Sequence, residues 1–214
     1  MSQNEPGFDE LLASAKRSAV HLEMRDVYGV GDEAQDFERW ARTGERDINP
    51  ASPYWAPWVD LIQRTVARGV AVRRARVVSE PVTDYIKYEH AGTVVNLQAG
   101  EQVRWLPRRH ASDIALPGND CWVFDDETVL FNHFTGEGSW SEPGWEVRTE
   151  PAVVRLAAAA FEAVWERGTP PREIFDLNHE PPKADSCPCP PRPVPKPRAK
   201  SSLPGFGICV SMRS

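Results

Sequence analysis

The stretch from residue 58 to residue 81 constrains the fold more than any other, because it specifies three consecutive elements. Val59, Ile62 and Val66 recur at helical spacing, so one apolar stripe of a helix faces inward. Gly69 follows the last turn, where glycine adopts a left-handed cap at no steric cost. The valines after it favour a strand, and the serine, glutamate and proline that close the stretch favour the start of another helix.

A helix, a short turn, a strand and a helix in this order are typical of a layered α/β unit. The same kind of pattern predicts a β-hairpin over residues 121–134, around an acidic turn. We therefore expect an α/β fold, in the broader α+β sense, with one mixed sheet flanked by helices. The predicted helices cover residues 33–42, 58–68, 80–90 and 151–167.

The ends of the chain differ in character from its middle. Residues 1–17 predict a flexible lead-in, and residues 18–168 predict a single α/β domain. Residues 169–214 predict a disordered tail, since 11 of the 20 prolines lie between Pro170 and Pro204 and the segment has no apolar periodicity.

Charge is unevenly distributed in a chain whose formal net charge is −6. Residues 60–112 carry 9 basic and 5 acidic side chains, which makes this segment a basic band in an acidic protein. The overall charge argues against non-specific DNA binding, whereas the band suits an acidic ligand or partner. No apolar run approaches the roughly 20 residues that span a bilayer, and the first residues lack the order of a signal peptide, so we expect a cytoplasmic protein without a membrane partner.

The basic band supplies the predicted binding site for an anion or an acidic partner, because arginine offers five fixed donors that match carboxylate and phosphate. Its candidate residues are Arg73, Arg74, Arg76, Arg104, Arg108, Arg109 and His110. Arg74 and Arg76 fall on the same strand face as the valines before them, so they need a partner or a ligand. An alternative of equal weight pairs the arginines with Asp84, Glu89 or Glu101 in ordinary salt bridges.

Three segments carry a resemblance to a known family: residues 68–72 (Arg-Gly-Val-Ala-Val), residues 96–107 and residues 120–131. They resemble an actinobacterial family of small cytoplasmic proteins known as a domain of unknown function. Members of that family are often encoded beside helix-turn-helix regulators of the Xre type. The resemblance covers about residues 18–170 and brings no activity with it, but it implies a helix-turn-helix regulator as a partner.

A helix leads into the strand at residues 68–70 (Arg-Gly-Val), and a hairpin follows at residues 124–126 (Phe-Asp-Asp). In these features the chain resembles the phospholipase-D-like fold, at the level of the fold alone. That resemblance implies a histidine nucleophile with a lysine two positions later. None of the five histidines has this lysine; His21, for example, is followed by Glu23. The sequence therefore predicts no catalytic residue, and it implies a version of the fold without the catalytic motif.

Metal and cofactor sites are not predicted either. Asp125, Asp126 and Glu127 are more typical of a solvated turn than of a cation site, and His133 is more typical of a bonded strand residue than of a base. His179 and the tail cysteines have the wrong spacing for zinc, and no glycine-rich phosphate loop occurs. We expect a non-catalytic regulatory or binding module that acts through a protein partner. The alternative is a phospholipase-D-like phosphodiesterase or nucleic-acid-binding protein that uses the arginines. The sequence leaves the oligomeric state open.

Overall fold

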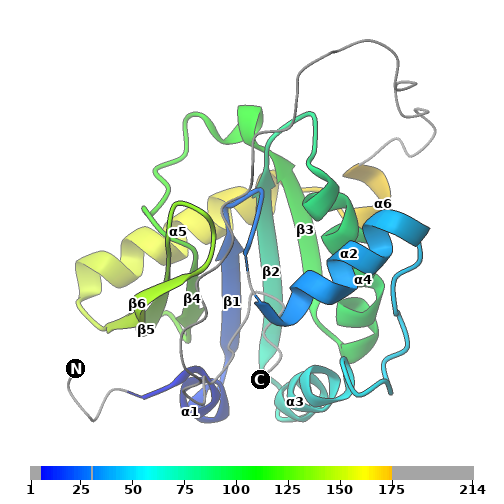
Figure 1. Ribbon diagram of the computed structural model, residues 1–214. Helices are drawn as coiled ribbons and strands as arrows, with labels where there is room; N and C mark the ends of the chain where they lie inside the picture. Colours follow the sequence, from blue (N-terminus) through cyan, green and yellow to red (C-terminus); the bar gives the residue numbers. More distant parts are fainter. Residues whose placement is uncertain (1–5, 30, 175–214) are drawn as a thin grey trace.

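One six-stranded mixed sheet organises the protein, in the order β3-β2-β1-β4-β5-β6 (Figure 1). The computed structural model describes residues 6–29 and 31–174. Strands β1, β2 and β3 are parallel, whereas β4, β5 and β6 are antiparallel and follow one another along the chain. The strand bounds are β1 Ser18–Glu23, β2 Ala71–Val78, β3 Gln102–Pro107, β4 Cys121–Phe124, β5 Thr128–Phe134 and β6 Trp140–Arg148.

Helices cover both faces of this sheet, with α5 on one side and α2, α3 and α4 on the other (Figure 1). Phe161 and its apolar neighbours on α5 pack against Leu22, Val77 and Val123 of the sheet. The helix bounds are α1 Phe8–Ser14, α2 Gly31–Thr43, α3 Ala56–Ala67, α4 Asp84–Ala99, a 3-10 turn η1 Arg108–Ala111, α5 Pro151–Arg167 and α6 Pro171–Ile174. The expected single α+β domain with a mixed sheet is confirmed. No helix in the described part of the chain is long and apolar enough to cross a membrane.

The predicted helix over 80–90 begins too early and ends too early. The helix starts at Asp84, where the hydroxyl of Thr83 accepts a hydrogen bond from the amide of Ile86 and caps the first turn. It runs to Ala99 and ends at Gly100, whose φ of 100° is the left-handed conformation that glycine favours. The residue that caps α4 is therefore Thr83, four residues after Ser79. Ser79 itself follows directly on β2.

Within the predicted flexible lead-in, the described residues 6–17 include a helix, α1. Phe8, Leu11 and Leu12 of α1 are buried against Trp58, Trp122 and Phe124. At the other end, the backbone of Thr169 pairs with that of Trp105 on β3, and α6 follows, so the domain continues past the predicted boundary at 168. The rest of the predicted tail, from residue 175, lies outside the described residues.

Candidate functional site

A network of charged side chains lies inside the protein, between the sheet and helices α3 and α4. β1 contributes Glu23 and β2 contributes Arg74 and Arg76, and all three are at most 4% exposed. Side chains alternate between the two faces of a strand, so Arg74 and Arg76 point to the same face. The parallel register places Glu23 next to Arg76 and His21 next to Arg74. The sheet thus brings one acid, Glu23, and three basic side chains into one buried row.

Glu23 joins the two arginines of this buried network. Its Oε1 lies 2.6 Å from Nη1 of Arg74, and its Oε2 lies 2.6 Å from Nε of Arg76. Each arginine has a second carboxylate: Nε of Arg74 donates to Glu101 at 2.7 Å, and Nη2 of Arg76 donates to Glu89 at 2.7 Å. Arg46 adds a third cation, 3.4 Å from Glu89. Three arginines therefore face three glutamates, so their charges balance when all three glutamates are ionised.

Neighbouring aromatic rings and an amide hold the buried network in place. The guanidinium of Arg74 lies 5.5 Å from the ring centre of Trp58, and that of Arg76 lies 5.0 Å from the ring centre of Trp105. The amide of Asn96 donates to Glu101 at 2.7 Å. Removing one charge from such a set leaves its partner buried and uncompensated, which is far costlier than losing an exposed pair.

His21 of β1 is also buried, beside Arg74 in the same row of side chains. Its ring stacks on Trp122 with 4.3 Å between centroids, and its Nδ1 lies 3.2 Å from Oε1 of Glu23. Burial, together with the nearby charges of Arg74 and Arg76, holds the pKa of His21 well below its usual value, so the ring is neutral near pH 7.

Burial opposes the ionisation of Glu23. Burial raises the pKa of Glu23 from 4.5 to about 7, because loss of solvent outweighs the attraction of Arg74 and Arg76. An acid whose pKa is raised by folding stabilises the fold below its unfolded pKa, and that contribution is lost as the pH rises through its folded pKa.

We therefore expect the free energy of unfolding to fall by roughly 3 kcal/mol between pH 4.5 and pH 7 on account of Glu23. Glu23→Gln should remove this part of the slope, whereas Glu166→Gln, at an exposed position of α5, should keep it. Urea melts from pH 4 to pH 8 measure the difference. Parallel curves for the wild type and Glu23→Gln would show that Glu23 does not titrate in this range.

A second group of polar side chains lies where the three parallel strands end. Arg108, in the turn after β3, donates from Nη2 to the carbonyls of Met24 and Val77, and from Nε to the hydroxyl of Ser79 at 3.0 Å. The carboxylate of Asp26 accepts from the amide of Ser79 at 2.7 Å and from its hydroxyl at 2.6 Å. Arg108 therefore ties the ends of β1, β2 and β3 together and is held in a fixed position.

Arg109 and His110 lie beside this tied end and face solvent. The side chain of Arg109 is 62% exposed and forms an ion pair with Glu80. Its Nε donates to Nε2 of His110 at 3.2 Å. We call Arg108, Arg109 and His110 the strand-end surface. Among the seven predicted site residues, Arg109 and His110 are the two that are exposed.

The other two predicted arginines lie on the opposite face of the sheet. Arg73 forms a two-bond ion pair with Glu162 of α5, at 3.1 and 2.6 Å. Arg104 donates to the carbonyl of Trp165 at 2.7 Å. Both guanidinium groups lie over the ring of Trp165 and attach α5 to the sheet.

The seven predicted site residues therefore separate into three places rather than forming one band. Arg74 and Arg76 are buried, whereas Arg108 and Arg109, expected with them in one anion-binding surface, lie in the turn after β3. The alternative of internal salt bridges is confirmed for Glu89 and Glu101. Asp84 pairs with Lys87 instead. Binding by the strand-end surface stays a prediction.

Sequence reasoning named Glu89 and Glu101 as possible partners of the arginines but missed Glu23. Glu23 was available from the pattern, since His21 and Glu23 lie two residues apart and match the spacing of Arg74 and Arg76. No spacing pattern in the sequence indicated that Arg46 would join the buried network. It lies in the loop between α2 and α3 and reaches α4 only through the tertiary fold, where its guanidinium donates to the carbonyl of Tyr88.

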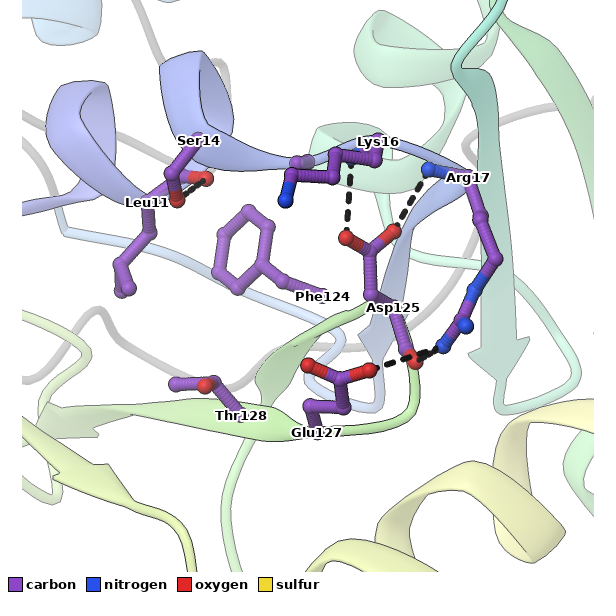
Figure 2. A pocket seen from close by; sticks show the side chains of 9 residues that line it. Leu11, Ser14, Lys16, Arg17, Phe124, Asp125, Glu127 and Thr128 are labelled. Atoms are coloured by element: carbon purple, nitrogen blue, oxygen red, sulfur yellow. Dashed lines mark hydrogen bonds and ion pairs between the residues drawn. The ribbon is translucent and has the colours of Figure 1, made fainter.

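One cavity of about 390 Å³ lies at the opposite end of the sheet, between α1 and the β4–β5 turn (Figure 2). Asp125 in that turn accepts hydrogen bonds from the amides of Lys16, Arg17 and Ser18, at 2.7 to 2.9 Å. Glu127 accepts from Arg17 at 3.2 Å. The acidic turn therefore holds the chain before β1 through contacts that the predicted solvated turn did not include. Both its aspartates have positive φ, as turn residues often do.

A second cavity, of about 310 Å³, lies next to the end of β1, lined by Met24, Arg25, Asp26, Val27, Gly136 and Glu137. Neither His110 nor His133 lines either cavity. His133 instead lies 3.7 Å from Glu146 on β6. Within residues 6–29 and 31–174, no three His, Cys, Asp or Glu side chains gather in a way that could hold a metal ion.

Comparison with known proteins places this domain in a family. A family model described as a domain of unknown function, DUF6879, matches residues 6–176. The chain belongs to the DUF6879 family. The match begins at α1 and ends after α6, so the DUF6879 domain spans the described fold and not only residues 18–168.

None of the curated proteins matches the sequence. Among solved structures, the DUF6879 domain is similar to a chain described as "Structure of TrmBL2, an archaeal chromatin protein, shows a novel mode of DNA binding". The identity is 15%, the TM-score is 0.39, and the alignment covers 76% of this chain and 48% of the other. The chain thus spans about half the length of that structure.

Proposed function

We propose that this DUF6879 domain is a non-catalytic regulatory or binding module that acts through an acidic protein partner. The partner docks on the strand-end surface. A helix-turn-helix regulator is the class of partner that the family resemblance suggests, and a phospholipase-D-like ancestry without the catalytic motif is compatible with it.

One observation carries this proposal: two adjacent arginines follow β3, and one is fixed by backbone carbonyls while the other is largely exposed. Arg108 is held by two backbone carbonyls, so its position is set before any partner arrives. Arg109 is 62% exposed, and its present partner Glu80 is itself 38% exposed. An exposed pair of this kind contributes little stability, so an acidic partner can compete with Glu80 at low cost. Pre-positioned cations steer and align an acidic surface.

The lining of the neighbouring cavity favours binding over catalysis. The cavity at the end of β1 holds Arg25, Asp26 and Glu137, and it brings together no nucleophile with a histidine base. His21, the histidine nearest the sheet centre, is fully buried and stacked on Trp122, so a substrate cannot reach it in this state.

Arg109→Glu tests the proposal, because it reverses an exposed charge without breaking the bonds of Arg108. We expect the variant to lose the partner that the wild type captures from extracts of its native host, with binding weakened by at least about tenfold. Wild-type binding should also weaken as salt is raised from 50 to 500 mM. Melting curves should coincide with those of the wild type.

Arg64→Glu is the matched control, since Arg64 is an exposed arginine on α3, which leads into the opposite end of β2. This variant should keep the partner. Capture of the same proteins by all three forms would overturn the proposal. Hydrolysis of bis(p-nitrophenyl) phosphate by the wild type, lost in Arg109→Glu, would favour the phosphodiesterase instead.

A further inference from the structure

The two edges of the sheet differ in how they end. On the β3 edge, the backbones of Trp105 and Thr169 exchange two hydrogen bonds at 2.9 Å, so a further stretch of chain covers part of that edge. β6 forms the other edge, and no strand within residues 6–29 and 31–174 lies beyond it (Figure 1). An uncovered edge strand presents backbone amides and carbonyls that can pair with another strand. We call residues 144–149 the β6 edge.

The register of the sheet shows which backbone groups of the β6 edge point outward. The amide of Asn132 on β5 donates to the carbonyl of Asp120, directly before β4, at 2.8 Å. Backbone groups of successive residues point alternately to the two neighbouring strands, so those of Phe131 point to β6. Phe131 lies opposite Glu146. Glu146 therefore uses its backbone groups to bond β5, and those of residues 145 and 147 point away from the sheet.

The side chains of the β6 edge divide between the two faces of the sheet. Trp145 and Val147 pack against the core that includes α1 and α3. Glu146 and Arg148 lie on the opposite face, 42% and 35% exposed, with 3.0 Å between Oε1 and Nη1. The edge therefore carries one acid and one base in a line, two residues apart, on either side of the outward backbone groups of Val147.

This order of charges is complementary to itself. In an antiparallel pairing of two β6 edges centred on Val147, Glu146 of each copy lies directly opposite Arg148 of the other. Moving the centre to Glu146 or to Arg148 sets like charges opposite each other, which destabilises a strand pair. The backbone agrees with the first register, because Val147 then faces Val147 and Trp145 faces Thr149. The amide of Thr149 gives up only an exposed contact with Glu150, at 3.2 Å.

We propose that the β6 edge is the docking surface for a second copy of this chain. The two copies pair antiparallel around a two-fold axis at Val147, and their six-stranded sheets join into one. Glu146 and Arg148 set the register. This surface lies at the opposite edge of the sheet from the turn after β3, so it stands whether or not Arg109 binds a partner.

Charge reversal on the full chain tests the pairing, with sedimentation equilibrium as the measurement. We expect the wild type to form dimers as its concentration rises toward about 500 μM, and Glu146→Arg or Arg148→Glu to weaken dimerisation at least about tenfold. An equal mixture of the two variants should dimerise as the wild type does, because every acid then lies opposite a base. Arg64→Glu, at an exposed position of α3, is the control and should leave dimerisation unchanged.

Hydrogen exchange in the wild type locates the interface without any variant. The amides of Trp145 and Val147 should exchange at least about tenfold more slowly in the dimer, whereas those of Glu146 and Arg148, which already bond β5, should change little. A wild type that stays monomeric at about 500 μM contradicts the proposal. A dimer without protection at Trp145 and Val147 also contradicts it, as does a mixture that dimerises no better than its two components.

Discussion

Arg76→Met should lower the free energy of unfolding by about 3–5 kcal/mol, because it leaves two buried glutamates without their shared cation. Arg76 lies between Glu23 and Glu89, at 2.6 and 2.7 Å, and all three side chains are at most 5% exposed. Methionine fills a similar volume, so the loss reports the uncompensated charges rather than a cavity. Urea melts at pH 8, where Glu23 is ionised, measure it.

Arg73→Met is the matched control for this prediction. Arg73 lies on the same strand but on the opposite face, and it pairs with Glu162, which is 49% exposed. We expect a loss of no more than about 1 kcal/mol, since an exposed pair is screened by water. Equal losses in the two variants would mean that burial adds nothing to the cost of breaking the network.

Phe161→Ala should cost about 3–5 kcal/mol, because the ring is fully buried in the core between α5 and the sheet. The ring also stacks on Trp165 with 5.7 Å between centroids and lies under the guanidinium of Arg73 at 4.9 Å. Removing it leaves a cavity and weakens the contact that attaches α5. Denaturant melts with a two-state fit give the value.

Leu156→Ala on the same helix provides the comparison, since Leu156 is 44% exposed. Its expected cost is below about 1 kcal/mol. A Phe161→Ala variant as stable as Leu156→Ala would show that the inward face of α5 is assigned wrongly.

Local patterns were enough to predict the elements whose ends carry their own signals. α5 was predicted at its observed bounds, because its apolar residues recur at helical spacing after a proline in the first turn. The hairpin of β4 and β5 was also confirmed, since alternating strands flank an acidic turn. The start of α4 was missed because two capping signals, at Ser79 and at Thr83, compete within one short segment.

The function of the arginines could not be read from their spacing. Arg74 and Arg108 have the same side chain and lie in the same basic band, yet one is 1% exposed and the other is 39% exposed. The difference arises because Arg74 lies mid-strand under helices α3 and α4, whereas Arg108 lies in the turn after a strand. A count of charges along the chain cannot distinguish these positions.

The sequence by itself determined the alternation that puts Arg74 and Arg76 on one strand face, the apolar stripe of α5 and the turn chemistry of Asp125 and Asp126. These depend on residues within a few positions of one another, where backbone geometry fixes the relation. Only the tertiary structure decided that Glu23, Glu89 and Glu101 pair with the arginines, and that Glu33 accepts hydrogen bonds from the hydroxyls of Tyr54 and Tyr85. Those contacts join residues from separate elements, and the pairing of strands β1 and β2 and the packing of α2 on α4 bring them together.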